Sequence, residues 1–322
     1  MDSSWRGEKL RLVVAGLALG EHFCSWSASL DYTSLADSLL FVTTTPILLV
    51  GYAAARWGVG WINAKARKGS KDPLEGLPVE PPTTLEVAGA AVGLFAAALL
   101  ASADSGVPSP NGVFVQPSPL GDALALLGAA FICVYLTVGA TLRQWMPLWL
   151  YVAPVTLVAA IACALFSFAF EGTTIVGTGP TSLFGGFAPE RFGIVFGSAI
   201  TAGILGHTAA NLAIEFISPL IVSILLLWEP LVGSIMGYFA GVQDSPSLIV
   251  YIAGFPLMLS AILVVAGKRG SPLHTRFQGL WSRSYCIWRS VTPTASRYVK
   301  VGTVEPARTD STGEGSLDAE RG

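Results

Sequence analysis

The sequence predicts an all-α protein, a polytopic membrane helix bundle of about eight transmembrane helices. Hydrophobic residues make up 52% of the chain and charged residues only 12%, about half of the charged share of an ordinary soluble domain. Apolar windows of about 20 residues recur along the chain, each long enough to cross a bilayer as a helix. The windows are apolar nearly all round, whereas helices of soluble proteins keep a polar face.

Eight windows follow one another along the chain, with edges expected to hold within a few residues. The first contains Glu21 and His22 and lacks a small-residue cleavage pattern, so we expect it to remain in the protein rather than to act as a signal peptide. Prolines interrupt several of the others. The windows are Leu10–Leu30, Leu35–Ala55, Thr84–Ala103, Gly121–Leu142, Met146–Phe170, Phe192–Phe216, Pro219–Gly241 and Ser247–Gly267.

The basic residues fall on one side of this bundle. Of the 19 Lys and Arg residues, 18 lie before or at the very start of the first window, after the last one, or in alternate connections, and the other connections hold only Arg191. The positive-inside rule places the basic side in the cytoplasm. We therefore expect an integral, multi-pass membrane protein with both termini cytoplasmic; the sequence does not indicate which membrane.

An internal repeat links the two ends of the bundle. The segment from Ala15 to Tyr52 is similar to the segment from Ala202 to Tyr238, and an offset of 184 residues stacks Pro46 on Pro230 and Ser34 on Ser218. Five helices separate the equivalent helices, which is an odd number, so the two copies face opposite ways across the bilayer. Inverted repeats of this kind are typical of secondary transporters.

The repeat divides the chain into four parts. Residues 1–103 form an incomplete first repeat of three helices, with a basic and irregular cytoplasmic loop at 57–82. Residues 104–120 form a non-cytoplasmic loop, and 121–267 a complete second repeat of five helices. Residues 268–322 form a cytoplasmic tail, first basic and aromatic, as suits anionic lipid headgroups or a solvated linker, and then disordered.

Three segments resemble the drug/metabolite transporter superfamily, of the EamA type. SASLDYTSLADSLLFVTTTPILLV is similar to the helix pair that opens the conserved part of that family, and LGDALALLGAAFICVYL resembles the start of its second repeat. ISPLIVSILLLWEPLVGSIMGY, followed by SPSLIVYIAGFPLMLSAILVVAG, resembles its last two helices. The resemblance implies ten helices in two inverted repeats and export or exchange of small organic solutes. Compared with that pattern, this chain lacks the first two helices.

Glu229 is the first candidate site residue, because it lies near the middle of an apolar run. A carboxylate at that depth is costly and is usually kept for function. It could serve as a proton site, as a counter-ion for a cationic solute, or as a partner of His207 on the preceding helix. Alternatively, it could hydrogen-bond backbone groups that Pro230 leaves free. The resemblance implies such a structural role.

His22 and His207 lie in the middle of repeat-equivalent helices and are candidates for proton coupling, since histidine titrates nearest to neutral pH. The alternative is a neutral imidazole that bonds another helix. Asn211, one turn after His207, could present its amide to a solute, although hydrogen bonding between helices is the favoured interpretation. The polar residues Thr44 and Thr45 are expected mainly to satisfy carbonyl groups released by the helix-breaking proline that follows them, or to line a cavity. Trp228 is either a stacking wall for a solute or a packing residue.

No enzyme signature is found. The chain lacks a Gly-rich phosphate loop, an HExxH helix and a serine-protease motif, and no Cys/His spacing suggests a metal site. We therefore expect a transporter of a small organic metabolite, driven by a gradient or by exchange, with no cofactor and no nucleic-acid partner. Its expected partners are the solute, protons, the lipid bilayer, and a second copy or a full-length paralogue. The alternative is a non-transporting regulatory or scaffolding membrane protein.

Overall fold

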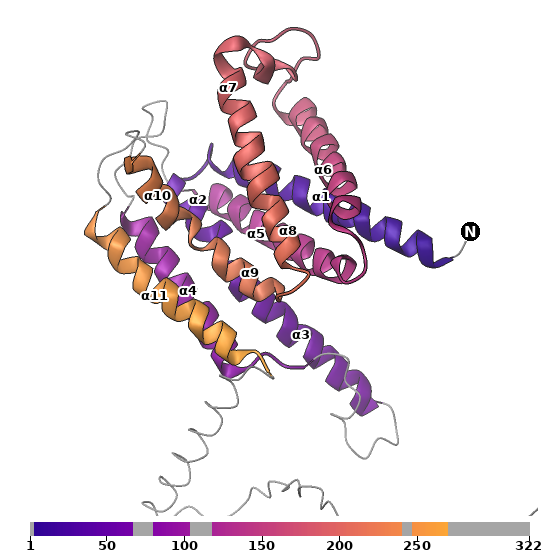
Figure 1. Ribbon diagram of the computed structural model, residues 1–322, viewed down its shortest axis with the longest axis vertical. Coiled ribbons are helices and arrows are strands. Elements are labelled where there is room, and N and C mark those ends of the chain that lie inside the picture. The colour runs from indigo at the N-terminus through magenta and orange to yellow at the C-terminus, as the bar shows by residue number, and fades with distance from the viewer. Residues whose placement is uncertain (1–2, 67–79, 104–117, 240–246, 270–322) are drawn as a thin grey trace, which may run out of the picture. The chain divides into compact units, whose positions relative to one another are not determined.

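The computed structural model describes residues 3–66, 80–103, 118–239 and 247–269 (Figure 1). These residues are 81% helical, and they contain no strand. In chain order, the helices are α1 (Ser3–Ser29), α2 (Leu35–Val42), α3 (Thr45–Ala66), α4 (Thr84–Ala103), α5 (Pro119–Arg143), α6 (Leu148–Phe170), the 3₁₀ helix η1 (Gly185–Phe187), α7 (Pro189–Ser198), the π-helix η2 (Ala199–His207), α8 (Thr208–Ala213), α9 (Pro219–Leu226), α10 (Glu229–Phe239) and α11 (Leu248–Gly267).

Six helical stretches among the described residues are long and apolar enough to cross a membrane, by length and composition. They are Asp37–Asn63, Thr84–Ser102, Pro119–Arg143, Leu148–Phe170, Pro189–Ala213 and Leu248–Gly267. The two other predicted windows are also helical, but α1 carries charged residues and the seventh window is divided between α9 and α10. The protein is an all-α, multi-pass membrane bundle, as predicted.

The loop expected at 57–82 begins later than predicted. Helix α3 continues to Ala66, about three turns beyond the predicted end of its window. The extension is possible because Trp57–Ala66 contains no proline, and a basic residue alone does not end a helix. Residues 67–79 lie outside the described ranges, as do nearly all of the predicted loop 104–120 and tail 268–322.

The helix boundaries reproduce the repeat predicted from the sequence. With the offset of 184 residues, the end of α1 falls on the end of α8, and the bounds of α2 fall on those of α9. The first residue of α3, Thr45, falls on the first residue of α10, Glu229. Each copy therefore contains a span that is broken at the same place, after a half-helix of 8 residues.

Helices α4 and α11 are both 20 residues long and lie side by side (Figure 1). They run antiparallel. Near the start of α4, Thr83 Oγ1 donates to the carbonyl of Gly267 at the end of α11 (3.1 Å), and further along Ser260 Oγ donates to Gly89 O (2.7 Å). Antiparallel packing of repeat-equivalent helices is what a twofold axis in the membrane plane produces.

Helix α1 is held between α5 and α6. Two glycines one turn apart on α1 allow α6 to approach, because a Cβ at Gly16 would lie 2.5 Å from Val158 Cβ and one at Gly20 would lie 2.8 Å from Ala162 Cβ. Small residues at this spacing are the usual means of close helix packing in a bilayer. Gly16 contacts Val158 and Gly20 contacts Ala162, so the residue numbers rise in the same direction along both helices. Helices α1 and α6 therefore run parallel.

We expect Gly16→Leu to destabilise the protein by about 1–3 kcal/mol, because the added side chain must displace α6. Thermal unfolding in detergent measures the change. Gly51→Leu is the matched control, because no described atom lies within 4 Å of a Cβ placed there. Equal melting temperatures for the two variants would contradict the close packing of α1 on α6.

Candidate functional site

The two broken spans are the most distinctive feature of the bundle. In the first, α2 ends at Val42 and α3 begins at Thr45. Pro46 has no backbone N–H, so the carbonyl group four residues earlier has no helical partner. Three threonine hydroxyls bond the carbonyls before the break: Thr43 to Leu39 O (2.8 Å), Thr44 to Phe41 O (2.7 Å) and Thr45 to Val42 O (3.0 Å). These bonds agree with the interpretation that Thr44 and Thr45 bond backbone carbonyls, and Thr45 bonds the carbonyl of Val42 that Pro46 releases.

The second break presents different side chains. Trp228 and Glu229 occupy the places that Thr44 and Thr45 hold in the first break. The Glu229 side chain is exposed at the start of α10, and none of the described residues bonds its carboxylate or pairs with it. In particular, it forms no ion pair with His207. A hydroxyl in α9, that of Ser223, donates to the carbonyl of Leu220 (2.8 Å). No described hydroxyl donates to the carbonyls of Leu225 and Leu226, which correspond to those of Phe41 and Val42 in the first break.

Two tryptophans carry buried indole N–H groups without a hydrogen-bond partner, Trp228 at the second break and Trp26 on α1. A buried donor without a partner costs free energy and is uncommon in folded proteins. Trp228 packs against a buried cluster around α4 and α11. Leu40, which lies two residues before the end of α2 and so close to the first break, packs against the same cluster. The two breaks thus border the same part of the bundle.

His22 and His207 both contact one aromatic ring, that of Phe23. The Phe23 ring centroid is 5.2 Å from that of His22 and 5.2 Å from that of His207. His22 Nδ1 is 2.9 Å from the carbonyl of Gly128 on α5. Because a carbonyl only accepts, this nitrogen carries the hydrogen and Nε2 is left as an acceptor. The structure brings the two predicted histidines together, and it fixes the orientation of one.

Asn211 is buried, and its side-chain amide bonds both another helix and the preceding turn of its own helical run. Its Oδ1 accepts from the hydroxyl of Tyr135 (2.7 Å), and its Nδ2 donates to the carbonyl of His207 (2.8 Å). Its own carbonyl accepts from Arg143 Nε (3.0 Å). These bonds agree with hydrogen bonding between helices, the interpretation that the sequence favoured.

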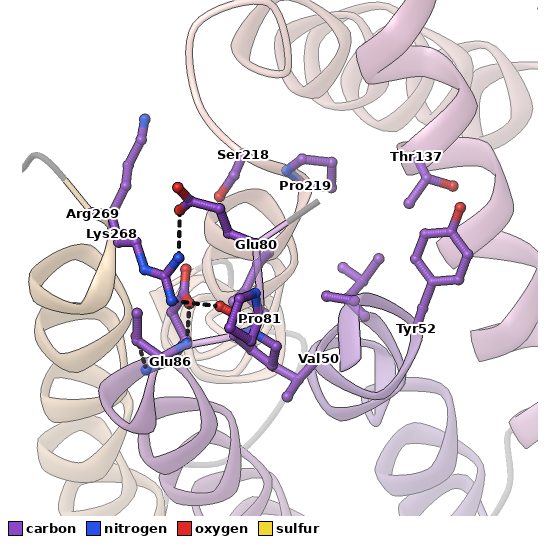
Figure 2. Close-up of a pocket in the computed structure, with 15 residues that line it drawn as sticks. Val50, Tyr52, Glu80, Pro81, Glu86, Thr137, Ser218, Pro219, Lys268 and Arg269 are labelled. Carbon is purple, nitrogen blue, oxygen red and sulfur yellow. Dashed lines mark hydrogen bonds and ion pairs between the residues drawn. The ribbon is translucent and has the colours of Figure 1, made fainter. Parts of the chain in front are cut away.

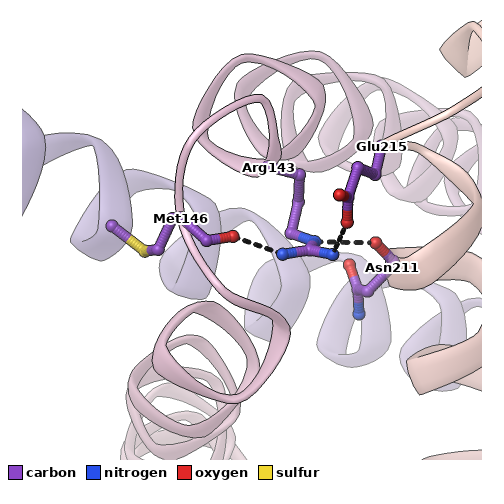
Figure 3. Close-up of polar contacts among 4 residues, drawn as sticks. All are labelled: Arg143, Met146, Asn211 and Glu215. Carbon is purple, nitrogen blue, oxygen red and sulfur yellow. Dashed lines mark hydrogen bonds and ion pairs between the residues drawn. The ribbon is translucent and has the colours of Figure 1, made fainter.

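Arg143 is much more buried than its sequence position predicts. It directly follows the window Gly121–Leu142, where the sequence places it among the basic residues of a connection. Its side chain is 2% exposed at the end of α5. Figure 3 shows the guanidinium group directed at three acceptors: the carbonyls of Met146 and Asn211 and the carboxylate of Glu215. One side chain thus ties α5 to the connection before α6 and to the turn between α8 and α9. No sequence signal distinguished it from the exposed cations.

The opposite end of α5 is held in a similar way. Thr33 Oγ1 donates to Asp122 Oδ1 (2.7 Å), and Ser118, the N-cap of α5, donates its hydroxyl to the carbonyl of Tyr32. A Cβ at Gly121 would meet Thr33 at 2.5 Å, so the backbones are in close contact there. The turn between α1 and α2 is therefore fastened to the start of α5.

A pocket of about 370 Å³ opens at the end of the bundle where α4 and α9 begin and α11 ends. Figure 2 shows Glu80 and Arg269 paired on one side of it (2.7 Å) and Tyr52 and Thr137 on the other. Its wall reaches Leu49, which is one turn after Thr45. The pocket thus extends from the predicted cytoplasmic edge to within a turn of the first break.

Comparison with known proteins shows the fold but not the family. No family model matches the chain, and no curated protein matches it. A solved structure described only as "Crystal structure of protein" superposes with a TM-score of 0.54, covering 82% of this chain and 77% of its own, at 20% sequence identity. At that identity the likeness concerns the fold alone. By its helices and their composition, this chain is a multi-pass membrane protein.

We expect Arg143→Met to cost about 3 kcal/mol of stability, because it leaves the Glu215 carboxylate without its partner and two carbonyls without a donor. Arg143→Lys should recover only part of the loss, since an ammonium group cannot match the planar guanidinium at three acceptors. Denaturant unfolding in detergent measures both. Arg11→Met, which removes an exposed pair with Glu8, should change stability by less than about 1 kcal/mol. Similar losses at both arginines would contradict a structural role specific to Arg143.

Proposed function

We propose that this chain is a secondary transporter of a small organic solute, of the drug/metabolite transporter type. The pair of equivalent helix breaks carries the proposal. In transporters built from inverted repeats, broken helices place half-helix ends and unpaired polar groups at a solute site near the bilayer midplane. Irregular backbone at that depth is tolerated only inside protein or beside a cavity.

The depth of the breaks supports this proposal. A half-helix of 8 residues is about 12 Å long, so each break falls near the middle of a hydrocarbon core of about 30 Å. The pocket that reaches Leu49 supplies a path from one edge toward the first break. Groups without a described partner that could serve a solute or a proton include the indole N–H groups of Trp26 and Trp228 and the carboxylate of Glu229.

Uptake into proteoliposomes tests the function. Purified protein is reconstituted, a metabolite mixture is added outside, and the solutes that enter are quantified by mass spectrometry against protein-free liposomes. We expect at least one solute to accumulate. No uptake, together with stable co-purification of a full-length relative, would favour the alternative of a regulatory or scaffolding membrane protein.

We expect Glu229→Gln to remove the pH dependence of uptake, because the amide keeps the shape of the side chain but cannot exchange a proton. Initial rates are measured across a pH series with each variant. Glu190→Gln is the control, because that glutamate is exposed beside Arg191 and outside the breaks. Full activity with an unchanged pH profile in Glu229→Gln would rule out the proton role of Glu229.

We expect Trp228→Phe to raise the KM for the transported solute about fivefold, the effect of losing one neutral hydrogen bond of about 1 kcal/mol. Phenylalanine keeps an aromatic ring but lacks the indole N–H. Trp149→Phe changes an exposed tryptophan on α6 and should leave the KM unchanged. If KM stays the same in both variants, the Trp228 N–H does not bind the solute.

A further inference from the structure

The helix that is equivalent to α1 in the second repeat is covered by little of the described part of the chain over most of its length. Helix α1 is packed by α5 and α6 and buries Ala15, Ala18 and Leu19. In α7 and η2, which correspond to most of α1, none of the residues is buried against the described part of the chain. The two copies of the repeat therefore differ in what surrounds them.

The glycines show the same contrast. Gly16 and Gly20 of α1 are in close contact with α6. In α7, Gly193 and Gly197 have the same four-residue spacing, but no described atom lies within 4 Å of a Cβ placed at either. Together with Ile200 and Ile204, which are 36% and 54% exposed, they form one stripe, which we term the α7–η2 face. The stripe contains no charged residue.

The repeat specifies what should cover this face. Helix α5 runs antiparallel to α1, since Thr33 meets Gly121 and Ser25 meets Gly128, whereas α6 runs parallel to it. The partner of α1 is thus a hairpin whose first helix is antiparallel and whose second helix is parallel. Equivalent packing around α7 therefore requires two consecutive helices, the first antiparallel and the second parallel to α7, with the turn between them beside the start of α7.

The consecutive helices α6 and α7 of a second copy, which we term its α6–α7 hairpin, have these directions relative to α7 of the first copy. Around a twofold axis along the membrane normal, α7 of the second copy is parallel to α7 of the first, and α6 of the second copy is antiparallel to it. Helix α6 is available for this contact, because Leu157, Ile161 and Leu165 are more than half exposed. No described helix of the same copy occupies the place.

We propose that two copies of this chain form a homodimer through their α7–η2 faces, each copy covering the other with its α6–α7 hairpin. Lipid tails are as apolar as these side chains, so burial alone does not drive the contact. The open glycines at positions 193 and 197 supply the close approach and van der Waals packing that do drive helix association in bilayers. The dimer does not depend on transport activity.

Photo-crosslinking in proteoliposomes at high lipid dilution tests the dimer. Ile204 is replaced by the photoreactive residue benzoylphenylalanine in one variant, and Ile252 of α11, which is 47% exposed, in the control. We expect irradiation at position 204 to give a product of twice the 33.7 kDa chain mass, and position 252 to give only lipid adducts. Lipid adducts alone at position 204, or equal dimer yields at both positions, would overturn the proposal.

Gly197→Leu provides a second measurement. Because no described atom lies within 4 Å of a Cβ placed at Gly197, we expect the variant to keep its thermal stability and helical spectrum. Its dimer should weaken by about tenfold or more, since the leucine keeps the two helices apart. Native mass spectrometry from lipid nanodiscs compares the two proteins. A wild-type chain that is monomeric there, or bound only to a different protein, also overturns the proposal.

Discussion

The bundle depends on how it satisfies the backbone groups that a proline releases inside a membrane. Water is absent there, so each unpaired carbonyl costs several kcal/mol unless the protein supplies a donor. The first broken span supplies three threonine hydroxyls, and Cys133 of α5 approaches the carbonyl of Thr45 (3.6 Å). The break is thereby built into the core, and the half-helices α2 and α3 take fixed directions around it.

The second repeat keeps this backbone break but changes its chemistry. Thr45 donates to the carbonyl of Val42, and the equivalent pair in the second repeat is Glu229 and the carbonyl of Leu226. A carboxylate cannot donate a hydrogen bond, but a protonated carboxyl group can. A protonated Glu229 would thus be able to donate to the carbonyl of Leu226 as Thr45 donates to that of Val42, whereas an ionised one would not.

The sequence predicts the helices, the repeat and the prolines at the breaks, because each is encoded locally by apolar windows and residue spacing. The burial of Arg143 is not encoded locally. Its acceptors on Asn211 and Glu215 lie 68 and 72 residues further along the chain, and its neighbours in sequence are those of a connecting loop. The unpaired N–H groups of Trp26 and Trp228 are also unpredictable, since whether a donor finds a partner depends on packing between distant helices.

Helix α5 is bonded to both repeats, because the turn between α1 and α2 holds its start and the equivalent turn between α8 and α9 holds its end. The turn between α1 and α2 bonds Ser118 and Asp122 at its start, and the turn between α8 and α9 bonds Arg143 at its end. The two contacts differ in strength: the first consists of neutral donors on a carbonyl and a carboxylate, and the second is a buried guanidinium with three acceptors. The end of α5 that Arg143 holds is therefore the more firmly fixed of the two.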